Sequence, residues 1–140
     1  MVDVNYWAVL AGAIASMVIG ALWYGPLFGK QWMALSGFSR EQLESQKAKG
    51  MGKRYGLMFV GSLLMAFVLS HSLVFASTYL DINGYMAGLM SAFWNWLGFI
   101  VPVTIGSVLW DGKPWKLWIL NNAYHLVTLS VMSVILALWV

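Results

Sequence analysis

Residues 4–29 read VNYWAVLAGAIASMVIGALWYGPLFG and contain no Asp, Glu, Lys or Arg. Three further stretches of the chain lack these four residue types, at 55–80, 82–110 and 117–140. A helix needs about 20 apolar residues to cross the hydrocarbon core of a bilayer, which is roughly 30 Å thick. Each of the four stretches is longer than that, so the sequence predicts four transmembrane helices.

The composition excludes an ordinary water-soluble domain. The chain has 140 residues, of which 61% are hydrophobic and 9% are charged, whereas soluble domains hold about 25% charged residues. A soluble helical bundle would also need a polar stripe along every helix. We therefore expect an all-α membrane protein, an antiparallel bundle that forms a single transmembrane domain over residues 1–140. The expected segments are helices at about 4–28, 55–80, 85–110 and 115–139, and a long cytoplasmic connection at 29–54.

The basic residues indicate how this bundle is oriented. All eight Lys and Arg lie in two stretches, residues 30–54 and 113–116, which are the first and third connections and therefore share one side. The positive-inside rule makes that side the cytoplasm. We therefore expect a protein of the cell inner membrane whose two termini both lie on the outer side. Charges in such short loops set the orientation and meet anionic lipid headgroups. The net charge of +3 therefore does not point to nucleic acid.

The long first connection carries one clear structural signal. Ser39 followed by Gln42 has the spacing of a capping box and predicts a short soluble helix from Arg40 to about Lys49. We expect the basic residues of this connection mainly to enforce topology. Specific binding of lipid or of a partner protein is the alternative.

Small residues recur at helical spacing on several of the predicted helices. Lipid supplies little hydrophobic force between helices, so close backbone approach over small residues favours their packing. Ser62, Ala66 and Ser70 form such a row on the second helix, and Pro102 should bend the third. The small-residue faces on the first and third helices offer more contact than one bundle needs, so we expect a homo-oligomer. The packing residues on the first and third helices are Gly12, Ser16, Gly20, Gly98, Pro102 and Gly106.

Charged and thiol chemistry is missing from the predicted spans. They contain no carboxylate, Lys or Arg at depth, and the chain has no Cys, which argues against ion-coupled transport, catalysis and thiolate metal sites. His71 and His125 should differ in depth by about 9 Å, too far to share a metal ion. We therefore expect no enzyme activity, no cofactor and no metal.

Neutral polar residues within the spans form the candidate site. Asn121, Asn122 and His125 lie at spacings that put them on one face of the fourth helix, and Pro102 should leave a carbonyl of the third helix free for Asn122 or His125. One interpretation is that these side chains only cross-link helices, at about 0.6 kcal/mol for each hydrogen bond. The alternative is a solvated cavity for a small molecule, or a proton path. The full candidate polar site is Asn95, Asn121, Asn122, His125 and His71.

An aromatic motif closes the first predicted helix. Trp23, Tyr24, Gly25 and Pro26 combine aromatic side chains suited to the headgroup level with a proline that ends or kinks the helix. The longer stretch GALWYGPLFGK at 20–30 resembles the signature of an uncharacterised bacterial family of small four-helix integral membrane proteins, a domain of unknown function. This resemblance implies the four-helix fold over nearly the whole chain and implies no known activity.

These observations favour an integral membrane protein that acts as a small channel, carrier or binding protein for a neutral or amphipathic solute. The alternative is a structural or accessory protein that binds a partner membrane protein or lipid through the connection at 29–54. Membrane lipids and further copies of the chain are the expected partners.

Overall fold

The computed structural model describes residues 2–139 and contains no strand among them. Four helical segments are long and apolar enough to cross a membrane. They are Tyr6–Leu27, Gly52–Leu80, Gly84–Leu109 and Trp115–Leu138. The predicted all-α fold with four membrane-spanning helices is therefore confirmed.

The first segment is an α-helix that ends in a wider turn. α1 (Tyr6–Leu22) continues into a π-helical turn, η1 (Trp23–Leu27). The Asn5 side chain caps the start of α1, since its Oδ1 accepts hydrogen bonds from the backbone N–H groups of Trp7 and Ala8 at 3.1 and 3.2 Å. Within η1, Gly25 leaves the helical conformation with φ −108° and ψ −105°, because a residue before proline is disfavoured there. This turn kinks the end of the segment.

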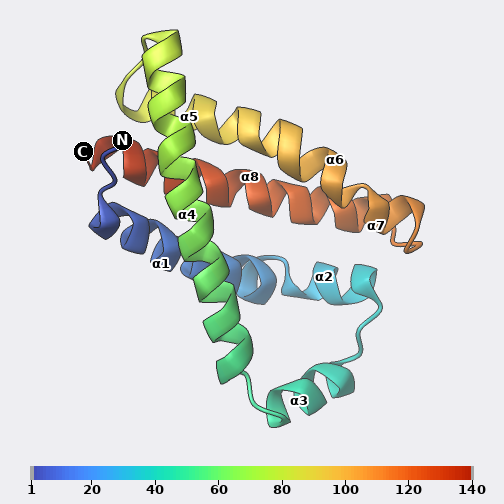
Figure 1. Cartoon of the computed structure of the whole chain (residues 1–140). Coiled ribbons are helices and arrows are strands. Elements are labelled where there is room, and N and C mark those ends of the chain that lie inside the picture. The colour runs from blue at the N-terminus through green and yellow to red at the C-terminus, as the bar shows by residue number, and fades with distance from the viewer. Residues whose placement is uncertain (1, 140) are drawn as a thin grey trace.

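Two short helices form the first connection, α2 (Gly29–Ser36) and α3 (Arg40–Ala48). The Ser39 hydroxyl accepts from the Gln42 backbone N–H at 3.2 Å, and the Gln42 side chain accepts from the Ser39 N–H at 2.9 Å. The predicted capping box is therefore confirmed. α3 lies apart from the bundle of long helices (Figure 1).

α4 (Gly52–Leu80) crosses the other long helices obliquely, whereas α1 and α8 (Trp115–Leu138) run side by side (Figure 1). With 29 residues, α4 is about 43 Å long, which exceeds the hydrocarbon thickness of about 30 Å. Its charge-free part, residues 55–80, is about 39 Å long, so α4 fits the bilayer with some tilt. A tilted course in the bilayer would therefore account both for the length of α4 and for its crossing of the other long helices.

The third segment is interrupted rather than continuous. Pro102 lies in its second half, in the first turn of a short helix, where the missing N–H is tolerated. The expected bend at Pro102 takes the form of a π-helical turn just before the proline. In chain order the elements are α5 (Gly84–Asn95), the π-helical turn η2 (Trp96–Ile100), α6 (Val101–Thr104) and α7 (Gly106–Leu109).

Small residues form the contacts of α1 with α4 and α8. The Ser16 and Ser62 hydroxyl oxygens lie 3.2 Å apart in a hydrogen bond. A Cβ on Gly12 would lie 3.7 Å from the Cβ of Ala66 and 3.8 Å from the Cβ of Met132. The small-residue rows of the first two predicted helices therefore lie at helix contacts.

The third segment packs differently from the sequence expectation. An added Cβ on Gly98 would meet no atom within 4 Å, and Pro102 is exposed. Gly98 lies inside η2 itself. Because η2 holds more residues per turn than an α-helix, each extra residue also rotates the face that follows, which carries Pro102, by about 100°. Gly88 makes the close approach instead, since its Cβ would lie 2.9 Å from the Ser133 carbonyl oxygen of α8. Gly106, which was also expected to pack, has only the Trp110 side chain beside it, at 3.5 Å.

The connections sort to the two ends of the bundle. Both ends of the described chain lie together (Figure 1), and the Asn5 side-chain amide donates to the Trp139 carbonyl oxygen at 2.8 Å. The Lys113 ammonium donates to the Ser36 carbonyl oxygen at 3.2 Å. The two basic stretches therefore share the end that carries α2 and the turn after α7, here called the basic end. The side of the membrane that the basic end faces stays a prediction from charge.

Candidate functional site

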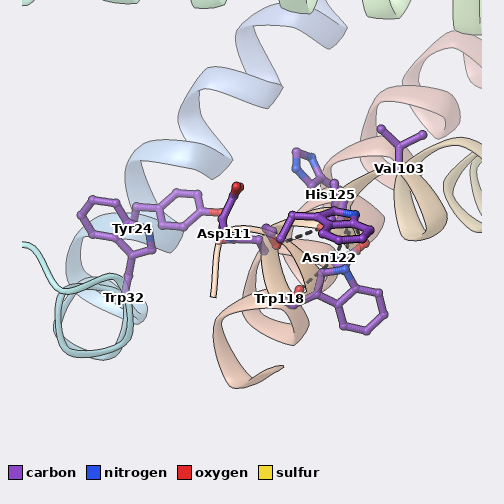
Figure 2. A pocket seen from close by; sticks show the side chains of 12 residues that line it. Tyr24, Trp32, Val103, Asp111, Trp118, Asn122 and His125 are labelled. Atoms are coloured by element: carbon purple, nitrogen blue, oxygen red, sulfur yellow. Dashed lines mark hydrogen bonds between the residues drawn. The ribbon is translucent and has the colours of Figure 1, made fainter. Parts of the chain in front are cut away.

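A cavity of about 640 Å³ opens at the basic end, between the first helical segment, the third segment and α8. We call it the basic-end cavity. Polar and aromatic side chains from all three parts of the chain line it (Figure 2). The lining residues are Tyr24, Trp32, Val103, Thr104, Gly106, Ser107, Trp110, Asp111, Trp118, Asn121, Asn122 and His125.

α8 supplies the polar wall of this cavity. Asn121 and Asn122 each lie three or four residues from Trp118 and from His125 along α8, a spacing that places them on the same side of the helix as those two residues. This is the cluster that the sequence spacing predicted, and three of its members were candidate site residues. The structure adds partners from the first and third helical segments.

Asn122 links α8 to α6 by a side-chain hydrogen bond. Its side-chain amide donates to the Thr104 hydroxyl at 3.0 Å and to the Trp118 carbonyl oxygen at 2.9 Å, and the Trp118 indole donates to the same hydroxyl at 3.1 Å. Asn122 is only 3% exposed, so losing one of these partners would leave a buried polar group unsatisfied. The expected partner was a backbone carbonyl freed by Pro102. The Thr104 hydroxyl takes that place because α6, after the π-helical turn, brings it to Asn122.

Tyr24 joins the first helical segment to α8. Its hydroxyl donates to Asn121 Oδ1 at 2.8 Å, and its ring lies edge-on to that of Tyr124, with centroids 5.0 Å apart. The Tyr124 hydroxyl in turn lies 3.1 Å from where a Gly20 Cβ would stand, so only a small residue fits there. Sequence reasoning assigned Tyr24 to an interfacial belt and missed this role. Its place in the Trp-Tyr-Gly-Pro motif was the one available signal.

Three groups on the cavity wall keep free hydrogen-bonding capacity. The Asn121 side-chain amide and the His125 imidazole make no further hydrogen bond to any residue between 2 and 139. His125 is half-buried, and its ring lies 5.1 Å from that of Tyr124. Asp111 is exposed and supplies the carboxylate of the lining. A ligand in this cavity would meet these three groups.

A family described as "Protein of unknown function (DUF1761)" matches residues 7–137. The chain belongs to the DUF1761 family. Neither the curated proteins nor the solved structures contain a match to it. The resemblance to an uncharacterised family is thereby confirmed, and the family description assigns no activity to the DUF1761 chain.

The other two candidate residues of the DUF1761 chain lie outside the cavity. Asn95 Nδ2 donates to the Ser72 hydroxyl at 2.6 Å and to the Ser91 carbonyl oxygen at 2.8 Å, so it links α5 to α4. His71 Nδ1 lies 2.9 Å from the Phe67 carbonyl oxygen of its own helix. Asn95 therefore bonds across two helices and His71 within its own helix, and the structure groups only Asn121, Asn122 and His125 of the five candidates.

The lining of the cavity in this DUF1761 chain combines polar and aromatic groups. It offers neutral donors and acceptors, one carboxylate and several aromatic faces. Across the described residues, no group of three or more His, Cys, Asp or Glu is arranged to hold a metal ion. Such a lining suits a small molecule that has both polar and apolar parts.

Proposed function

We propose that this DUF1761 protein binds a small neutral or amphipathic solute in the basic-end cavity, as a carrier or binding protein of the membrane. The observation that carries the proposal is the cavity itself. At about 640 Å³ it falls within the size of small-molecule sites, about 300–1,000 Å³. It also brings together groups with free hydrogen-bonding capacity from α8 and from the turn after α7.

The lining divides into residues that hold the cavity and residues that face a ligand. Asn122, Thr104 and Trp118 satisfy one another, so they support the wall. The Asn121 amide and the His125 imidazole have capacity left for a polar group of the solute. The aromatic rings of the lining can cover an apolar part of the same molecule.

The charge of the cavity supports a solute without a strong net charge. Asp111 is its one carboxylate, and it is exposed rather than enclosed. No lysine or arginine lines the cavity. A fully charged solute would have to leave water without a buried counter-charge, which is costly.

The test is a thermal-shift screen of neutral amphipathic compounds against the detergent-purified protein, with tryptophan fluorescence as a second readout. Compounds that bind should raise the Tm of the parent protein and lose that effect in His125→Ala and Asn121→Ala. Asn95→Ala is the matched control, because Asn95 lies outside the cavity. The proposal fails if compounds that shift the parent protein shift His125→Ala and Asn121→Ala equally.

A second candidate function, binding of an anionic lipid headgroup, has its own observation. A cleft of about 340 Å³ between α2 and α3 is lined by Lys30, Arg40 and Lys47, together with Trp32 and Glu44. Basic groups beside the membrane attract anionic headgroups, at about 1 kcal/mol for each Lys or Arg. This cleft supports an accessory role at the membrane surface.

Lipid-dependent stability tests this second candidate. Phosphatidylglycerol should raise the Tm of the parent protein more than phosphatidylcholine does, and Lys30→Ala with Arg40→Ala and Lys47→Ala should remove the difference. Lys53→Ala with Lys116→Ala is the control, since neither residue lines the cleft. Equal responses of the two sets of variants would reject headgroup binding in this cleft.

A further inference from the structure

A second cavity of about 240 Å³ lies deeper in the bundle, between α1, α4 and α8. Its polar lining includes Ser16, Ser62, His125 and Thr128, beside Tyr124 and the apolar Met58, Met65, Ile100 and Leu129. His125 also lines the basic-end cavity. From Trp115 to Thr128, α8 rises by about 20 Å, so Thr128 lies well inside the span. The two cavities therefore adjoin at one imidazole.

Thr128 carries a buried hydroxyl without a partner. The residue is 3% exposed, and its Oγ1 makes no hydrogen bond within the described chain. Threonines elsewhere in these helices bond a backbone carbonyl one turn earlier, as Thr78 does to Val74 at 2.8 Å. An unsatisfied buried hydroxyl costs about 1–3 kcal/mol. A hydrogen-bonding occupant of the cavity would remove that cost.

The serine pair on the opposite wall also has capacity to spare. The Ser16 and Ser62 oxygens lie 3.2 Å apart, and only one of their two protons can lie between them. The other proton and the remaining lone pairs can bond an occupant of the cavity. Together with His125 and Thr128, four side chains offer partners, whereas a buried water needs two to four and about 10–15 Å³ of volume.

We propose that this second cavity holds water and extends an aqueous path from the basic end past His125 to Thr128. The inference goes beyond the proposed function, because it requires no solute. The competing occupant is a lipid acyl chain, since Met58 and Gly61 also line the cavity and are exposed at the bundle surface. A hydrocarbon chain would leave the Thr128 hydroxyl unsatisfied, whereas water bonds it.

Cysteine accessibility tests the path directly, because the chain has no Cys of its own. Thr128→Cys is compared with Ser133→Cys, which is also buried and without a hydrogen-bond partner but lines none of the cavities described. A small neutral water-soluble methanethiosulfonate should modify Thr128→Cys at least about tenfold faster, since thiolate chemistry needs water. Equal rates would overturn the proposal. So would reaction of Thr128→Cys with a lipid-soluble maleimide alone, which would indicate an acyl chain.

Hydroxyl-radical footprinting of the unmodified protein decides the question if Thr128→Cys does not fold. Met65 lines the second cavity, and Met132 is fully buried at 0% exposed. Met65 is only half-buried, so the decisive readout is the effect of Thr128→Val, which should slow oxidation of Met65 several-fold and leave that of Met132 unchanged. An unchanged Met65 rate in Thr128→Val would overturn the proposal. Equal oxidation of the two methionines would overturn the aqueous path. Both assays omit solute, so their failure is separate from failure of the binding screen.

Discussion

Gly88→Ala is the sharpest test of how α5 and α8 pack. An added Cβ would lie 2.9 Å from the Ser133 carbonyl oxygen and 3.0 Å from both the Ser133 carbonyl carbon and the Val134 Cα. Carbon atoms in ordinary contact lie about 3.5–4.0 Å apart, and these neighbours are backbone atoms that cannot rotate away. α5 must therefore move outward along the interface, and overpacking of this kind costs about 1–3 kcal/mol.

Gly56→Ala is the matched control for this substitution. Gly56 lies in α4 and has no atom within 4 Å of an added Cβ. Both variants gain a similar helix propensity, about 1 kcal/mol for alanine over glycine, so that gain cancels in the comparison. We expect Gly88→Ala to be less stable than Gly56→Ala by about 1–3 kcal/mol.

The assay is unfolding of the purified protein in mixed micelles with rising sodium dodecyl sulfate, followed by tryptophan fluorescence and circular dichroism. The midpoint for Gly88→Ala should fall below that for Gly56→Ala, with the parent protein as reference. If Gly88→Ala unfolds at the same midpoint as Gly56→Ala or above it, α5 and α8 do not approach as closely as described.

Three further predictions concern the site, the orientation and the assembly. Asn122→Ala should lower stability by about 1–3 kcal/mol in the same unfolding assay, because the buried Asn122 amide gives up its hydrogen bonds to the Thr104 hydroxyl and the Trp118 carbonyl oxygen, each worth about 0.5–1.5 kcal/mol. Asn121→Ala should change stability less, and the reverse order would contradict the assignment of Asn122 to the supporting residues of the cavity wall. Ser45→Cys, on α3, should react with an impermeant maleimide in inverted vesicles and not in intact cells; labelling from outside would reverse the orientation. Light scattering should give a protein mass above the 15.6 kDa of one chain, and a mass of one chain would reject the homo-oligomer.

The four helical spans could be predicted because their signal is local. A charge-free stretch such as residues 4–29 needs no knowledge of its neighbours to be assigned to a membrane span. The Ser39–Gln42 capping box was equally local, and both of its hydrogen bonds form. Each of these features depends on residues within a few positions of one another.

The packing of the third segment could not be predicted in the same way. Assigning residues to one helix face from α-helical spacing assumes an uninterrupted α-helix. The π-helical turn η2 interrupts that spacing before Pro102 and Gly106. Nothing in the sequence distinguishes Gly88 from the exposed glycines, because only the nearby α8 backbone prevents a larger residue at this position. The contact partners, rather than the residue type, decide its role.

Three of the five candidate polar residues line the cavity, Asn121, Asn122 and His125. The helical spacing of Asn121, Asn122 and His125 placed them on one face, as the cavity wall shows. Asn95 shows the limit of this reasoning, because its amide is bonded by Ser72 and Ser91. Tyr24 shows another limit, since its bond to Asn121 joins residues 97 positions apart. Spacing along one helix cannot reveal a partner on another.

The oblique course of α4 makes the fold responsive to the thickness of the bilayer. α1 and α8 lie side by side, whereas α4 crosses them and is longer than the hydrocarbon core, so a change in bilayer thickness is met by a change in its tilt at a modest cost (Figure 1). Ser62 and Met58 of α4 form one wall of the second cavity. A thinner or thicker membrane would therefore act first on α4, and through it on the width of the space around Thr128.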